Sequence, residues 1–191
     1  MARIRTFIAI AIESFVQDKL TSMQQKLARE APDVRWVPEE NRHLTLHFLG
    51  EVPELDLVGI CRVVERVTGR LEPFRVEIRG LGAFPTPRRP RTLFAAITEG
   101  AESLKILHAA LEDELVELGG YRREVRDYSP HITLGRVQVS EENEDLPALM
   151  LKHAKWDGGG IAVKEVLVMS SELERKGPTY MTVGRGRLRG S

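Results

Sequence analysis

The chain has 191 residues, in which 28 Lys and Arg balance 28 Asp and Glu. This length suits one domain or two small fused lobes, and the zero net charge excludes a global positive field as the means of attracting nucleic acid. Cys61 is the only cysteine, which excludes an intrachain disulfide and favours a reducing, cytoplasmic setting. No apolar stretch reaches membrane-spanning length, so we expect no membrane partner.

Hydrophobic periodicity predicts the elements of the first half. They are a strand at 3–12, a helix at 14–29, a strand at 43–50, a helix at 54–69 and a strand at 73–80. Ser14 is the expected N-cap of the first helix. In the strand at 43–50, alternation directs Leu44, Leu46 and Phe48 into the core.

The second half repeats this order after a Pro-rich segment at 84–90, which we expect to be a stiff loop. The predicted elements are a strand at 92–98, a helix at 101–118, a strand at 130–137, a helix at 144–155 and strands at 161–169 and 179–187. The repeated order predicts an α+β fold built from a duplicated unit. We expect a single bilobal domain over residues 1–191, with two interleaved lobes related by a pseudo-twofold axis around a central cleft.

One tetrapeptide occurs in both halves. His43-Leu44-Thr45-Leu46 returns as His131-Ile132-Thr133-Leu134. Because side chains alternate along a strand, each motif should present one imidazole and one hydroxyl on one face and two aliphatic side chains on the other. The duplication would bring the two motifs face to face across the cleft.

Two facing imidazoles suit concerted acid–base catalysis, since a histidine can act as base or acid near neutral pH. The adjacent hydroxyls can donate hydrogen bonds to anionic oxygens. This combination fits phosphoryl chemistry. Two histidines without a nearby carboxylate or cysteine supply too few ligands for a zinc site, so we expect no metal and no cofactor.

The motifs and their surroundings resemble the 2H phosphoesterase superfamily, and more narrowly the RNA 2′,3′-cyclic phosphodiesterases, also called 2′-5′ RNA ligases. The segments that carry this resemblance are Arg5–Ile10, His43–Gly50, Phe84–Arg91, Pro130–Arg136, Ser171–Leu173 and Gly177–Tyr180. The resemblance implies two antiparallel sheets that flank the site, with helices outside. It implies hydrolysis of an RNA terminal 2′,3′-cyclic phosphate to a 2′-phosphate, and also 2′-5′ joining of tRNA halves.

The resemblance also assigns roles. His43 would protonate the leaving 3′-oxygen and His131 would activate water, while Thr45 and Thr133 would bind the phosphate. Arg136 matches a basic position that the family uses near the phosphate. Strict alternation, however, places Arg136 on the face opposite His131, and it reaches the site only if the strand ends, twists or bulges.

Other polar and aromatic residues have weaker claims. His47 shares a face with His43 by alternation and is expected to line the cleft without a catalytic role. His108 is expected to be a partly buried, structural histidine on its helix. Trp36 and Tyr128 precede the two motif strands, and either would stack a nucleobase or simply pack.

Alternatives to the RNA cyclic phosphodiesterase stay open. One is a phosphodiesterase for a small cyclic nucleotide such as ADP-ribose 1″,2″-cyclic phosphate, and another is an RNA-binding module without catalysis. Arginine clusters at 88–91, 122–126 and 185–189 favour a polymeric anion. The expected partner is therefore an RNA end bearing a cyclic phosphate, bound by a monomer.

Overall fold

The chain is described by a computed structural model that covers residues 2–31, 33–138, 145–174 and 177–190. The helices are α1 (Ser14–Glu30), α2 (Leu57–Gly69), α3 (Ala101–Leu118) and α4 (Asp145–Lys152), with short 3-10 turns η1 (Glu39–Asn41) and η2 (Glu54–Asp56). The strands are β1 (Arg3–Ile10), β2 (Val34–Trp36), β3 (Leu44–Pro53), β4 (Phe74–Thr86), β5 (Arg89–Ile97), β6 (His131–Val137), β7 (Asp157–Val163), β8 (Glu165–Glu174) and β9 (Gly177–Arg187). In the described part of the chain, no helix is both long and apolar enough to cross a membrane.

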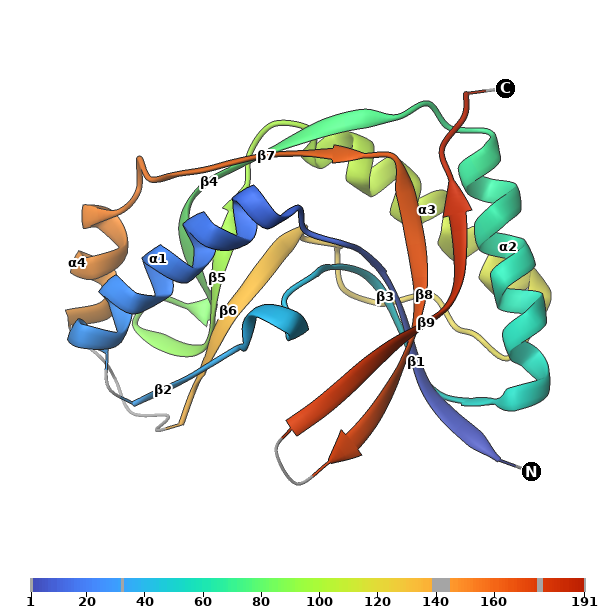
Figure 1. Ribbon diagram of the computed structural model, residues 1–191, viewed down its shortest axis with the longest axis horizontal. Helices are drawn as coiled ribbons and strands as arrows, with labels where there is room; N and C mark the ends of the chain where they lie inside the picture. Colours follow the sequence, from blue (N-terminus) through green and yellow to red (C-terminus); the bar gives the residue numbers. More distant parts are fainter. Residues whose placement is uncertain (1, 32, 139–144, 175–176, 191) are drawn as a thin grey trace.

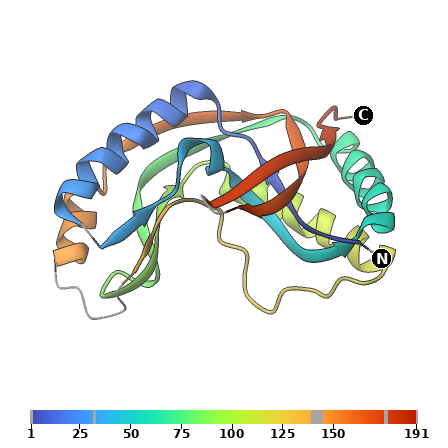
Figure 2. The same cartoon turned by 60° about the horizontal axis from the view of Figure 1, so that its bottom comes forward.

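The strands form one antiparallel sheet in the order β7-β4-β5-β6-β3-β1-β8-β9, and β2 pairs with β6. Strands β3, β1, β8 and β9 make the first arm of this sheet, and strands β6, β5, β4 and β7 make the second. The paired residues that join β3 to β6 are Leu44 and Ile132. The predicted α+β class is thus confirmed, and the two predicted sheets are the two arms of one curled sheet, whose arched shape is seen in Figure 2.

Each arm is covered by helices from both halves of the chain. Helices α2 and α3 pack on each other and α2 packs on β8 and β9 of the first arm, whereas α1 packs on β7 and α4 on β4 of the second arm. Figure 1 shows these two helix pairs at opposite ends of the molecule. Helix α1 follows β1 of the first arm but covers the second, so each half of the chain supplies a helix to each arm.

Amphipathic spacing explains how the helices attach. Helix α1 buries Val16, Leu20, Met23 and Leu27, and helix α3 buries Leu104, Leu107, Leu111 and Leu115. These positions recur every three or four residues and form one apolar stripe on each helix. The helical spacing of apolar residues in the sequence predicts both stripes, except that Leu118, which continues the spacing of α3 and was expected to be inward, is 44% exposed.

Several predicted boundaries were wrong. The Pro-rich segment is the tip of the β4–β5 hairpin, in which Pro85 pairs with Pro90 close to the turn, where the missing N–H groups cost few ladder bonds. The predicted strand at 161–169 is two strands, β7 and β8, that meet near Lys164. Ser14 is the first residue of α1, Glu13 is its N-cap, and no side-chain cap bond forms. The predicted helix at 144–155 is α4, and residue 144 lies outside the described residues.

Both motif strands contain a β-bulge at the same position of the motif. In the β1–β3 pairing, Ile8 is opposite His47 and Ala9 is opposite Thr45, so Leu46 is the extra residue. In the β5–β6 pairing, Leu93 is opposite Gly135 and Phe94 is opposite Thr133, so Leu134 is the extra residue. An extra residue reverses the alternation that follows it. The seven residues from His43 and the seven from His131 consequently show the same order of buried and accessible positions.

Candidate active site

The two motifs meet where the arms of the sheet join. Leu44 on β3 pairs with Ile132 on β6 in antiparallel register, and both side chains are fully buried. The positions of His43 and Thr133 fall one step to one side of this pair, and those of Thr45 and His131 one step to the other. Directly opposite residues of an antiparallel pair are close neighbours on one face. The charge of His131 lowers the pKa of His43, so the two imidazoles lie close enough to interact.

His43 lies among aromatic rings of the first arm. Its imidazole stacks on Phe7 with ring centroids 4.7 Å apart, and the ring of Tyr180 meets it edge-on at 5.4 Å. Burial lowers the pKa of His43 to about 4, a hydrogen bond with the Asn41 backbone opposes this shift, and the charge of His131 lowers the pKa further. The free site therefore holds His43 as a neutral imidazole at pH 7.

His131 has a matching environment on the second arm. The rings of Phe84 and Phe94 lie 5.0 and 5.1 Å from its imidazole. Burial lowers the pKa of His131, the hydrogen bond to Ser129 opposes the shift, and the charge of Arg136 lowers it further. The Ser129 carbonyl lies 2.8 Å from Nδ1 of His131. A carbonyl only accepts, so Nδ1 carries the proton and Nε2 keeps its lone pair for a substrate.

Arg136 lies on the same face of β6 as Thr133 because of the bulge at Leu134. Thr92 pairs with Arg136, and Phe94 pairs with Thr133. Thr92 and Phe94 are two residues apart on β5 and share a face, so their partners on β6 share a face too. The charge of Arg136 acts on His131 and on Tyr180. The sequence left the position of Arg136 dependent on such a bulge, and the structure has it.

Arg5 was not singled out by sequence analysis. It is two residues from Phe7 on β1, so both side chains lie on one face of the strand. Burial raises the pKa of Tyr180, and the positive charges of Arg136 and Arg5 oppose that shift. Arg5 thus joins Arg136 in making this region electropositive. The sequence signal that could have identified Arg5 was its position on the first strand, two residues before Phe7.

The bulge at Leu46 overturns two predictions about β3. Phe48, expected in the core, is 65% exposed, and its ring centroid lies 6.0 Å from that of Phe7, which stacks on His43. His47, expected on the cleft wall, is buried on the opposite face, where its Nε2 donates to the His108 carbonyl at 2.9 Å. Strict alternation failed because the extra residue exchanged the faces of these two side chains.

The remaining predicted residues have structural contacts. His108 is buried, as expected, and Tyr128 stacks on it while its hydroxyl donates to the Thr45 carbonyl at 2.8 Å. Trp36 is partly buried against the core and lies over Gly135. Tyr128 and Trp36 therefore pack against the protein. Among the described residues, the group with metal-ligand spacing is His47, His108 and Glu112, and it includes neither His43 nor His131.

Comparison with known proteins identifies relatives over nearly the whole chain. The family model described as LigT like Phosphoesterase matches residues 10–94 and again residues 97–180, and each match contains one H-x-T-L motif. A Methanothermobacter thermautotrophicus protein named RNA 2′,3′-cyclic phosphodiesterase is 35% identical over 186 residues, which cover 97% of this chain and all of that protein.

Solved structures have the same fold. The crystal structure of TT0787 from Thermus thermophilus is 30% identical, covers 98% of this chain and 100% of that one, and superposes with a TM-score of 0.83. The structure of Escherichia coli LigT in apo form gives a TM-score of 0.79 at 23% identity and covers 98% of this chain and 99% of that one, which shows likeness of fold.

Proposed function

The chain belongs to the LigT-like phosphoesterase family, and from this premise we propose that it hydrolyses the terminal 2′,3′-cyclic phosphate of RNA to a 2′-phosphomonoester. The observation that carries the proposal is that the two H-x-T-L motifs meet at Leu44 and Ile132, with the two imidazoles close enough for the charge of His131 to act on His43. Relatives named RNA 2′,3′-cyclic phosphodiesterase support the choice of substrate.

The proposed reaction needs one base and one acid on opposite sides of phosphorus. Nε2 of His131 takes a proton from water, the water oxygen bonds to phosphorus, and the bond to the 3′-oxygen breaks. His43 donates its proton to that oxygen, and the phosphate stays on the 2′-oxygen. Thr45 and Thr133 donate hydrogen bonds to the two non-bridging oxygens, and the Arg136 guanidinium offsets their negative charge.

Arg136 breaks the symmetry between the two histidines. Its positive charge lowers the pKa of His131, which keeps that imidazole neutral and able to accept a proton. The equivalent position after the first motif is Phe48, which carries no charge. The bound phosphate anion raises the pKa of His43 and lets it hold the proton that the leaving oxygen needs. This asymmetry supports His131 as base and His43 as acid.

The same geometry accommodates ligation. When the 5′-hydroxyl of a second RNA replaces water, His131 takes its proton and the 5′-oxygen bonds to phosphorus. The 3′-oxygen leaves with the proton of His43, and the product is a 2′-5′ phosphodiester. We therefore propose 2′-5′ joining of tRNA halves as a second outcome, favoured when the second RNA excludes water.

The substrate side of the site favours nucleotides. Phe48 and the partly buried Tyr180 offer ring faces near His43, and an aromatic face contributes about 1–3 kcal/mol per stacked base. Arg88, Arg89 and Arg91 lie at the tip of the β4–β5 hairpin, where they are placed to follow a phosphate backbone. We propose that the RNA runs from Phe48 past the histidines toward this hairpin.

The test uses an RNA oligonucleotide that ends in a 2′,3′-cyclic phosphate, with and without excess chelator. The expected product by phosphorus NMR is the 2′-phosphomonoester in both cases. His43→Ala and His131→Ala should each lose about 100- to 10,000-fold in kcat, whereas His153→Ala, outside the site, is the matched control. A 3′-phosphate product would contradict the assigned roles. Loss of turnover in chelator, restored by a divalent metal, would contradict a mechanism based on the histidines alone.

Comparison of the oligonucleotide with a mononucleotide and with ADP-ribose 1″,2″-cyclic phosphate decides the substrate class. A higher kcat/KM for the oligonucleotide is expected because Phe48 and the arginines of the hairpin contact parts of the substrate beyond the reacting phosphate. An equal or higher kcat/KM for a small molecule would indicate that the protein is a phosphodiesterase for small cyclic nucleotides. Binding without turnover of any of the three would indicate an RNA-binding module.

A further inference from the structure

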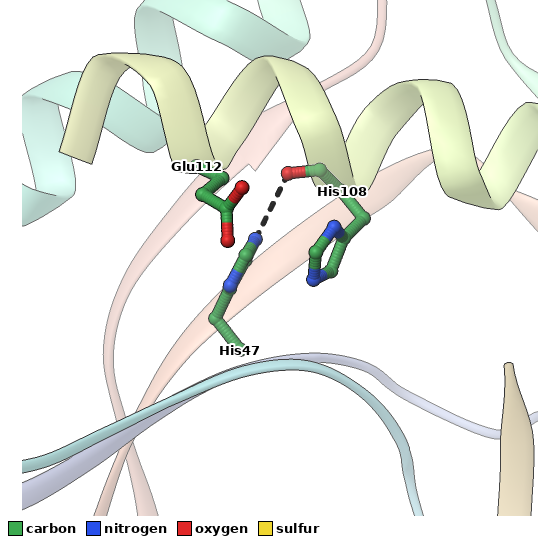
Figure 3. A group of neighbouring side chains, drawn as sticks. All are labelled: His47, His108 and Glu112. Atoms are coloured by element: carbon green, nitrogen blue, oxygen red, sulfur yellow. Dashed lines mark hydrogen bonds between the residues drawn. The ribbon is translucent and has the colours of Figure 1, made fainter. Parts of the chain in front are cut away.

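Behind the site, three aromatic side chains form a ring stack, which consists of His47, His108 and Tyr128. The imidazoles of His47 and His108 lie 4.0 Å apart with planes 21° from parallel, and the rings of His108 and Tyr128 lie 4.2 Å apart at 11°. Figure 3 shows His47 beneath helix α3 and its bond to the His108 carbonyl. Three parallel rings from three separate segments therefore form one packed column.

The ring stack contacts the first catalytic motif and is adjacent in sequence to the second. His47 belongs to β3, two residues beyond Thr45, and its Nε2 donates to the α3 backbone. The Tyr128 hydroxyl donates to the Thr45 carbonyl at 2.8 Å. Tyr128 also precedes Ser129, whose carbonyl holds Nδ1 of His131. The stack thus connects the phosphate-binding Thr45 to the segment that sets the tautomer of His131.

The segment that carries Tyr128 is irregular and is held to the protein at separate points. Residues 119–130 contain no helix or strand, and most of them are exposed. Arg123 and the Glu124 backbone N–H bond to Glu112 of α3, and the ring of Tyr128 and its hydroxyl bond hold the end of the segment. Because Ser129 directly follows Tyr128, the ring stack holds the Ser129 carbonyl from one side, and the buried Pro130 and β6 hold it from the other.

The same cluster has the residue types of a metal site, and its geometry argues against that use. Potential ligand atoms of His47, His108 and Glu112 lie within 4.8 Å of one another. Nearly parallel stacked imidazoles, however, direct their in-plane lone pairs along separate planes and cannot both aim at one ion. Nε2 of His47 is already bonded, and Glu112 accepts from the Glu124 backbone N–H and from Arg123.

We propose that the ring stack is a positioning device for the active site, which holds Thr45 and the Ser129 carbonyl in register and so fixes His131 with Nε2 free. Its catalytic consequence rests on the function proposed above. Burial lowers the pKa of both stacked histidines, that of His108 to about 4, although Glu112 faces both rings and Glu124 faces His47. Both rings are therefore neutral at pH 7 and serve as flat packing surfaces.

The test distinguishes the packing of a flat ring at position 108 from the acid–base chemistry of an imidazole there. His108→Phe keeps a flat ring in the column, and His108→Ala removes it. We expect His108→Phe to retain kcat within about threefold, and His108→Ala to lose about 10- to 100-fold in kcat with little change in KM, since a misplacement of about 1 Å costs about 100-fold. When both variants are assayed well below their Tm, a loss of stability alone would not make His108→Phe active and His108→Ala impaired.

A second measurement needs no substrate. The imidazole nitrogen signals of His131 report its tautomer directly, and they should keep the Nδ1–H form in the wild type and His108→Phe but become a tautomer mixture in His108→Ala. If wild-type protein fails to hydrolyse cyclic phosphates, the proposed function is lost while these signals still test the stack. If His108→Ala does not fold, Tyr128→Phe decides, because it keeps the ring and removes only the bond to Thr45. It should lower kcat several-fold.

Three results would overturn the proposal. One is wild-type kcat and an unchanged His131 tautomer in His108→Ala or, where that variant does not fold, in Tyr128→Phe. Another is an equal loss of activity in His108→Phe and His108→Ala, which would mean that the imidazole chemistry matters rather than the ring. The third is stoichiometric binding of zinc that both His108 variants abolish, which would make the cluster a metal site.

Discussion

An anion bound between the two motifs should raise the pKa of His43. In the free protein that pKa is lowered to about 4, chiefly because the ring is desolvated between Phe7 and Tyr180. Sulfate imitates the charge and shape of the phosphate and stays a dianion across the range of interest. Its binding beside Thr45 and Thr133 would place negative charge against the imidazole, which favours the protonated form.

The size of the effect follows from the contact. An opposite charge within about 4–6 Å changes a pKa by about 1–3 pH units, so the pKa of His43 should rise from about 4 to about 5–7 when sulfate is bound. By linkage, lowering the pH through that range should tighten sulfate binding, by up to about tenfold in the dissociation constant for every pH unit that separates the free and bound pKa of His43. The sign is fixed, because the anion binds the protonated imidazole better than the neutral one.

The assay is a pH titration of the histidine ring signals with and without saturating sulfate, at constant ionic strength. His108 is an internal control, because burial also lowers its pKa to about 4 but it lies outside the site, in the ring stack. We expect the titration of His43 to move and that of His108 to stay. Equal shifts of the two signals, or no shift of either at saturation, would refute a phosphate position between the motifs.

Three further predictions concern stability and substrate contacts. The pKa values of His43 and His108 are lower in the folded state than in the unfolded state, so the free energy of unfolding should fall by up to about 3 kcal/mol for each histidine as the pH drops from about 6.5 towards 4. Urea unfolding should show a smaller fall with pH in His108→Phe than in the wild type. Identical pH dependence of the two proteins would contradict this. Arg136→Met should raise both KM and the pKa of His131, with the exposed Arg29→Met as control, and an unmoved pKa would place the guanidinium elsewhere. Phe48→Leu should weaken oligonucleotide binding by about 1–3 kcal/mol while Leu151→Ala, also exposed, leaves it unchanged; equal affinities would exclude stacking on Phe48.

The sequence by itself determined the parts of the protein that depend on local pattern. The leucine spacing of α1 and α3 predicted their buried stripes, and the repeated H-x-T-L motif predicted two strands with His and Thr on one face. These inferences held because periods of 3.6 and 2 residues follow from backbone geometry alone. The order of elements, repeated from residue 92, likewise indicated a duplicated α+β unit before any contact between the halves was known.

Only the tertiary structure decided where alternation breaks. Nothing in the letters of Leu46 or Leu134 marks a bulge, because a bulge is a property of the pairing between two strands and depends on the register of the neighbour. Those two extra residues put Phe48 on the face of Thr45 and Arg136 on the face of Thr133, and they turn His47 to the opposite face. The ring stack was hidden from the sequence for the same reason, since its three rings come from segments far apart along the chain and meet only when β3, α3 and the segment before β6 pack together.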